Sequence, residues 1–108
     1  ENDINLCAYH LPLDAHPSIG NNAQIASRFG LYDVMMTDIC TVGNSSEPLP
    51  FSDFTRQAKE MFGEIVCAKK FASDTVSRLG ICSGGGGDFA QKCFEAGADT
   101  FLVGEVSE

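Results

Sequence analysis

The last third of the chain carries the pattern that most constrains the fold. Residues 76–82 (VSRLGIC) are rich in strand-forming residues, and residues 83–87 (SGGGG) can make a tight turn directly after them. Asp88 can cap a helix that Gly97 ends, and residues 100–103 (TFLV) follow as a second predicted strand. A strand, a turn, a helix and a strand within about 30 residues make a βαβ unit. The sequence therefore predicts an α/β fold of the three-layer α/β/α type, built from such units.

The rest of the chain contains further strand-like runs separated by polar segments. Short apolar runs typical of strands cover residues 4–9, 31–42 and 64–71. Residues 31–42 can form either one strand or two. Residues 10–20 contain two prolines and are predicted to form a loop. Residues 43–50 (GNSSEPLP) are polar and rich in turn formers, so we expect an exposed connection there.

Two further helices are predicted from cap and stop residues. Asn21 can cap a helix that Gly30 ends, and Ser52 can cap a second helix that Gly63 ends. The second helix has an apolar face with the spacing i, i+4, i+7 and i+8, made by Phe54, Ala58, Met61 and Phe62. These helices would cover the predicted sheet.

Charge and composition exclude several classes of partner. The 108 residues contain 15 Asp and Glu against 7 Lys and Arg, which gives a net charge of −8. An acidic chain repels phosphate backbones, so we expect no direct binding to nucleic acid. No apolar run approaches the length of about 18 residues that a membrane helix needs, so we expect no membrane contact. The five cysteines are odd in number and form no C-x-x-C pair, which is typical of reduced thiols in a cytoplasmic protein.

Both histidines of the chain lie in one short loop. His10 and His16 flank Asp14 in the segment HLPLDAH, directly after a predicted strand. Pro12 and Pro17 stiffen this loop and lower the entropic cost of holding its side chains together. Imidazole and carboxylate groups are ligands of Zn, Mn and Fe, so the segment indicates metal binding or catalysis. The alternative is a capping or surface role, and other ligands would have to come from elsewhere.

The glycine turn allows a second interpretation. Gly85, Gly87 and Ala90 satisfy the spacing G-x-G-x-x-A, and Glu105 lies 20 residues beyond Gly85, so the dinucleotide-binding pattern is formally met. However, Asp88 would put a carboxylate where a pyrophosphate should bind, and as a helix cap it would compete for the same amides. We therefore favour a structural turn, with dinucleotide binding as the alternative.

Two carboxylates follow the last predicted strand. Glu105 and Glu108 lie in the segment GEVSE at the carboxyl end of residues 100–103. Carboxylates at such positions either face a site or face water, and the sequence alone favours water.

Three stretches of the sequence resemble the GTP cyclohydrolase I type 2 homolog family. They are residues 2–31, which include HLPLDAHP and GNNAQ, residues 82–87 (CSGGGG) and residues 96–108 (AGADTFLVGEVSE). The resemblance implies an α/β protein of two similar halves, about twice this length, that assembles into ring-shaped hexamers around a cavity. In that arrangement residues 1–42 end the first half, residues 43–75 form a linking helix and strand region, and residues 76–108 open the second half.

The resemblance also implies a site with two divalent ions of Zn, Mn, Fe or Mg. Asp14 corresponds to the aspartate ligand of the family, whereas a His-His pair would precede Glu1 and a His and a Glu would follow Glu108. His10 and His16 would then orient Asp14 or transfer protons. Glu105 and Glu108 would face the cavity.

The function implied is that of a metal-dependent hydrolase, in which two ions activate water to attack an unknown small-molecule substrate. The present chain would be an inactive piece of that enzyme. Two alternatives stay open: a non-enzymatic oligomeric scaffold or adaptor with a structural metal site, and dinucleotide binding at residues 85–90.

Overall fold

The computed structural model describes residues 2–8, 10–70 and 73–106. In these residues four strands form one sheet: β1 (Tyr32–Thr37), β2 (Cys40–Pro50), β3 (Thr75–Cys82) and β4 (Thr100–Val103). The helices are α1 (His10–Asp14), α2 (Asn21–Arg28), α3 (Phe51–Phe62), the 3₁₀ turn η1 (Gly87–Phe89) and α4 (Ala90–Glu95). Within the described part of the chain, no helix is both long and apolar enough to span a membrane.

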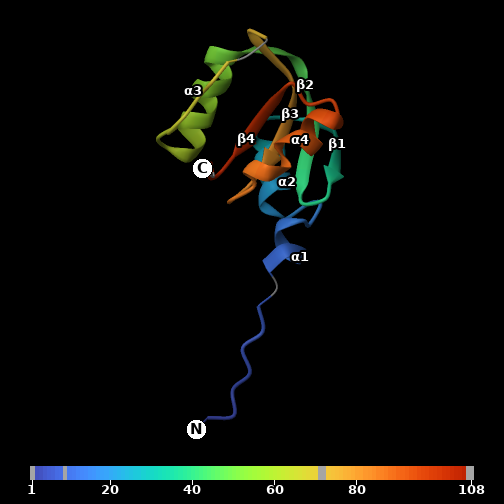
Figure 1. Ribbon diagram of the computed structural model, residues 1–108, viewed down its shortest axis with the longest axis vertical. Helices are drawn as coiled ribbons and strands as arrows, with labels where there is room; N and C mark the ends of the chain where they lie inside the picture. The colour runs from blue at the N-terminus through green and yellow to red at the C-terminus, as the bar shows by residue number, and fades with distance from the viewer. Residues whose placement is uncertain (1, 9, 71–72, 107–108) are drawn as a thin grey trace.

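The strands follow one another across the sheet in the order β1-β2-β3-β4 (Figure 1). β1 with β2 and β2 with β3 are antiparallel, and β3 with β4 is parallel. The parallel pair is joined through η1 and α4, so the βαβ unit predicted for the last third of the chain is confirmed. The protein is thus a mixed α/β fold in which the antiparallel strands come first.

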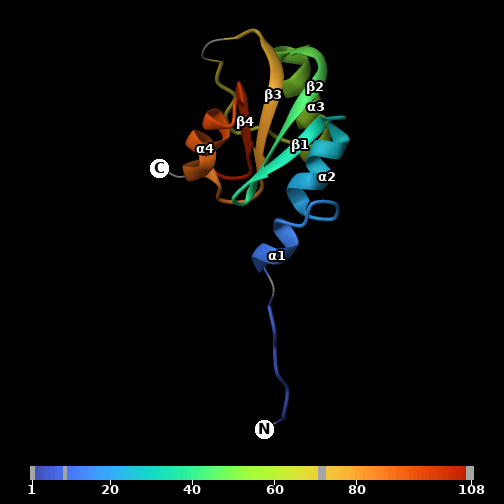
Figure 2. The ribbon, with the colours of Figure 1, turned by 90° about the vertical axis from the view of Figure 1, so that its right-hand side faces the viewer.

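Helices cover both faces of this sheet (Figure 2). One core cluster lies beneath α2 and α3 and contains Ala26, Phe54, Val76, Leu79 and Ile81. The other lies beneath α4 and contains Cys40, Val42, Cys82, Cys93 and Ala98. At the end of β3, Leu79 and Ile81 belong to the first cluster and Cys82 belongs to the second. A Cβ added at Gly80 would lie 2.8 Å from the Cβ of Cys93. Gly80 therefore allows α4 to approach the sheet closely.

Residues 2–8 form no strand, which contradicts the strand predicted at residues 4–9, although Tyr9 lies outside the described residues. A strand needs a partner, and this segment extends away from the sheet (Figure 1). Its apolar side chains are exposed, with Leu6 at 94% of its surface. The loop predicted for residues 10–20 begins with α1, because Pro12 is in the first turn, where no backbone N–H is needed.

The two predictions around α3 are also wrong. Residues 43–50 are the second part of β2 rather than a connection, because Gly43 pairs with Leu79 and Leu49 pairs with Val76, although residues 46–48 and 50 are exposed as expected. The register shifts between Asn44 and Leu49, and that irregularity accommodates polar residues and a proline in a strand. Residues 64–70 form no strand, since they pair with none of the four strands, and Phe71 lies outside the described residues.

The remaining corrections concern boundaries. Residues 31–42 form parts of two strands, joined by a tight hairpin in which Thr37 pairs with Cys40. The helix expected to start after Ser52 begins at Phe51, with Pro50 in the cap position. Asp88 lies inside η1 and makes no side-chain capping bond, so it does not have the predicted capping role.

Candidate functional site

Two of the segments singled out in the sequence meet at the carboxyl end of β3. A cleft of about 510 Å³ lies between α1, the start of α2 and the glycine turn. Its lining includes His10 and Asp14 from α1, Asn21 and Asn22 from α2, and residues 82–86 from the end of β3 and the turn. The sheet topology thus brings the HLPLD segment and the SGGGG turn together, although about 70 residues separate them in the chain.

Asp14 is the last residue of α1, and its carboxylate is held in a defined orientation. The Asn21 side-chain amide donates to Asp14 Oδ1 at 2.7 Å. The other oxygen, Oδ2, lies 3.7 Å from His10 Nε2, one helical turn earlier. The Asp14 side chain is 22% exposed, whereas that of His10 is 85% exposed. The carboxylate therefore has one fixed oxygen and one oxygen that faces an accessible imidazole.

His16 does not line this cleft. Its Nδ1 lies 3.3 Å from the backbone N–H groups of Ser18 and Ile19 and accepts hydrogen bonds from them. The ring therefore stabilises the turn between α1 and α2. These hydrogen bonds hold the His16 ring against its own turn rather than against the Asp14 carboxylate.

Asn22 is a site residue that the sequence reasoning missed. It is 2% exposed, its Nδ2 donates to the carbonyl of Ile39 at 2.6 Å, and its Oδ1 accepts from the N–H of Ser83 at 2.7 Å. One buried amide thus joins α2 to the β1–β2 hairpin and to the glycine turn. The available signal was its position four residues before Ala26, on the buried face of the helix.

Glu105 lies beside the glycine turn. Its N–H donates to the carbonyl of Gly84 at 2.9 Å, and a Cβ added at Gly85 would lie 3.7 Å from Glu105 Oε2. The N–H groups of Ser83 and Gly86 already donate within the protein. A nearby carboxylate and occupied amides disfavour a pyrophosphate here, which supports a structural turn. Glu108 lies outside the described residues.

A complete metal centre does not form from these residues alone. Among the side chains the structure describes, no group of three or more His, Cys, Asp or Glu residues is arranged to hold an ion. Asp14 and His10 are a pair at most, whereas a zinc site uses three or four protein ligands. The donor set fits a metal only as one part of a site that other residues complete.

Relatives of known name match nearly the whole chain. It is 36% identical to the GTP cyclohydrolase 1 type 2 homolog of Haemophilus influenzae, over 99% of this chain and 45% of that protein. It is 38% identical to the protein of the same name from Escherichia coli, over 99% of this chain and 44% of that protein. The chain therefore spans less than half the length of these relatives.

Solved structures share the fold. A structure described as protein ybgI, of unknown function, matches with a TM-score of 0.81 and 37% identity, over 98% of this chain and 44% of that one. Staphylococcus aureus protein SA1388 matches with a TM-score of 0.76 at 18% identity, which concerns the fold alone. The family model for Duf34/NIF3 (NGG1p interacting factor 3) matches residues 1–108. This chain is a member of the Duf34/NIF3 family.

Proposed function

We propose that this chain supplies one part of the active site of a metal-dependent hydrolase, with Asp14 as a metal ligand. The observation that carries the proposal is the Asp14 carboxylate, held by Asn21 in a cleft next to the glycine turn. The name of the relatives, GTP cyclohydrolase 1 type 2 homolog, supports a hydrolytic reaction without identifying the substrate.

The residues of this chain would orient the ligand and handle protons. Asn21 fixes Asp14 Oδ1, so that Oδ2 is available to an ion. His10 Nε2, near that oxygen and exposed, is suited to accept or donate a proton at the mouth of the cleft. Divalent ions, when bound, supply Lewis-acid chemistry and lower the pKa of water. His16 would act only through the backbone turn that it stabilises.

The remaining parts of the proposal concern the longer protein. We infer two divalent ions of Zn, Mn, Fe or Mg, with the other ligands outside residues 1–108. Residues 1–42, 43–75 and 76–108 would be the end of one half, a linking region and the start of a second half, in a ring-shaped hexamer in the cytoplasm. The identity to relatives of about twice this length supports such a division. Glu105, beside the turn, and Glu108 would face the cavity of the ring.

The test uses the full-length protein and the substitution Asp14→Asn, which keeps the shape of the side chain. We expect elemental analysis to find less bound metal than in the unchanged protein, and hydrolysis of cyclic-amide or phosphate-ester substrates to be lost. Asp53→Asn on the exposed face of α3 is the matched control and should retain metal and turnover. Full metal content after Asp14→Asn would overturn the assignment. Unfolding by chelator, without turnover of any substrate, would instead indicate a scaffold with a structural metal.

A further inference from the structure

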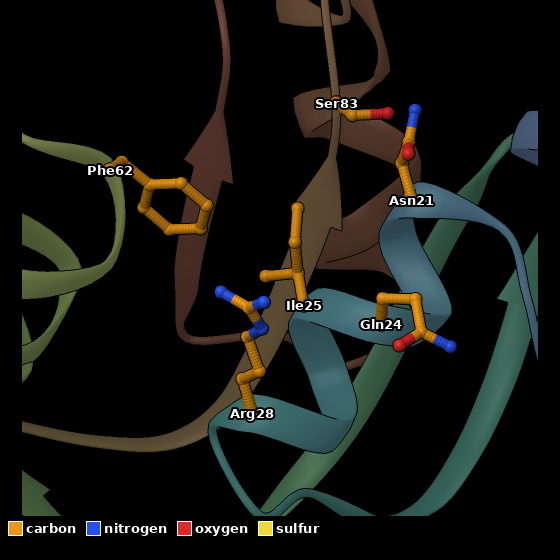
Figure 3. A pocket seen from close by; sticks show the side chains of 6 residues that line it. All are labelled: Asn21, Gln24, Ile25, Arg28, Phe62 and Ser83. Carbon is orange, nitrogen blue, oxygen red and sulfur yellow. The ribbon is translucent and has the colours of Figure 1, made fainter.

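A second groove adjoins the cleft at Asp14. It has a volume of about 370 Å³ and is lined by Asn21, Gln24, Ile25, Arg28, Phe62 and Ser83. These residues come from α2, from the last residue of α3 and from the end of β3, as Figure 3 shows. Asn21 and Ser83 line both grooves, so the two adjoin at these residues. The volume lies within the range of about 300 to 1,000 Å³ that is typical of small-molecule sites.

The groove has an apolar wall and a cation. Phe62, Ile25 and Arg28 extend into the same space, with Asn21 and Ser83 at its other end (Figure 3). Phe62 is 49% exposed, whereas Phe54 and Ala58 of the same helix are buried, so this aromatic ring is only partly covered by the protein. Gln24 directs its amide elsewhere, since Nε2 donates to the carbonyl of Ser18 at 2.6 Å.

Arg28 has no ion pair within the described part of the chain, although acidic residues outnumber basic ones by 15 to 7. In contrast, Arg56, Lys70 and Lys92 each pair with a nearby carboxylate. A guanidinium stays charged at all relevant pH values and favours carboxylate and phosphate oxygens. Arg28 is in the last turn of α2, where its charge interacts favourably with the helix dipole. That interaction alone does not account for the apolar side chains on the opposite side of the groove.

We propose that this groove is a binding site for a small organic anion with a flat apolar body. The anionic group contacts Arg28, and the flat part lies against Phe62 and Ile25. Carboxylates and phosphates share this chemistry. The site does not depend on bound metal, so its test and the metal test on Asp14 can fail independently.

The experiment uses the full-length protein after treatment with chelator, so that no probe is turned over. Phenyl phosphate and benzoate are titrated by calorimetry, and saturation-transfer NMR reports the ring protons in contact with protein. Inorganic phosphate and benzyl alcohol are the probes that carry only one of the two features. We expect at least one aromatic anion to bind saturably and more tightly than inorganic phosphate or benzyl alcohol. Whichever of phenyl phosphate and benzoate binds more tightly identifies the anionic group that the site prefers.

Variants locate the binding in the groove. Arg28→Gln should weaken binding of the aromatic anion by about tenfold, because a charge-assisted hydrogen bond is lost. Phe62→Ala should weaken the aromatic anion more than inorganic phosphate. Arg56→Gln, a surface arginine on α3 outside the groove, is the matched control and should leave affinity unchanged. Absence of saturable binding by both aromatic anions, or equal affinity in Arg28→Gln with an unchanged melting temperature, would overturn the proposal.

Discussion

At the scale of single residues, the amide of Asn22 uses both its donor and its acceptor to connect distant segments. It is buried, and it both donates, to Ile39, and accepts, from Ser83. An aspartate would lack the donor, and an alanine would leave a backbone carbonyl and a backbone N–H unsatisfied in the interior. The position of the glycine turn relative to α2 therefore depends on an amide at this position.

Asn22→Ala should lower the free energy of unfolding by about 2 to 3 kcal/mol, because two buried backbone groups lose their partner. Urea titration of this chain, followed by circular dichroism, measures the change. Asn5→Ala, in the exposed segment at residues 2–8, is the matched control and should change stability by less than about 0.5 kcal/mol. Equal midpoints for the two variants would show that Asn22 has no structural role.

The orientation of the Asp14 carboxylate likewise depends on one side-chain amide, that of Asn21. Asn21→Ala removes the hydrogen bond to Oδ1 and leaves Asp14 itself in place. In the full-length protein this change should weaken metal affinity by about 10- to 100-fold, as loss of a ligand's hydrogen-bond partner typically does. Competition with a fluorescent chelator gives the affinity. An affinity equal to that of the unchanged protein would mean that Asn21 does not orient the ligand.

At the scale of elements, local signals were sufficient where turn and stop residues mark the ends of each element. The strand, turn, helix and strand of the last third are neighbours in sequence and in space, so the glycine turn and Gly97 predicted them. The predictions for residues 43–50 and 64–70 failed because local composition does not determine which segments pair in the sheet. Whether each becomes a strand depends on the pairing partner that the folded sheet offers it, and no local pattern records that.

The candidate site likewise contains some residues that the sequence predicts and others that it does not. Asp14 and the glycine turn could be picked out from residue type and spacing, and the cleft brings them together. The separation of His16 from that cleft, and the connection through Asn22, both depend on how α2 packs on the sheet. Such contacts between distant segments leave only a weak trace in the sequence, namely a polar residue on an apolar helix face.

The packing of α4 on the sheet makes the stability of the fold depend on pH through buried thiols. Cys40 and Cys93 face each other across this layer with Cys82, and burial is the main cause that raises the pKa of both Cys40 and Cys93 above the ordinary value of 9.0. The neighbouring thiols raise the pKa of Cys40 further. The folded state therefore keeps protons that the unfolded chain releases in alkaline solution.

The contribution of these thiols to stability should consequently be constant well below pH 9 and be lost as the pH rises above 9. In that range the unfolded state binds fewer protons than the folded state, so each such thiol lowers the free energy of unfolding by up to about 1.4 kcal/mol per pH unit. Urea midpoints between pH 7 and pH 10.5 measure the slope. Cys40→Ala should reduce it, whereas Cys7→Ala, at an exposed thiol, should not. A slope that Cys40→Ala leaves unchanged would contradict this account.

At the scale of the whole molecule, the strands differ in how firmly they are held. β3 is hydrogen-bonded on both sides, to β2 and to β4, and contributes to both core clusters. α1 has five residues, none of them buried, and packs mainly against α2. Regions with few buried contacts open with a small free energy, whereas a central strand opens only with global unfolding.

Hydrogen exchange should reveal this difference directly. We expect the amides of Leu79, Gly80 and Ile81 to exchange at least about 100-fold more slowly than those of Asp14 and Ala15, after correction for intrinsic rates. Exchange followed by NMR or mass spectrometry of this chain gives the rates. Comparable protection in α1 and β3 would mean that α1 is part of the cooperative core.

The cleft therefore has two walls of different rigidity. The wall at the end of β3, which carries Ser83, opens only when the sheet does, whereas the wall that carries Asp14 can open by itself. A ligand held at Asp14 must then supply the free energy that keeps α1 closed, so its measured affinity is lower than its affinity for the closed form. Occupancy of the cleft would be visible as slower exchange in α1 with no change in β3, a signature obtainable before any substrate is known.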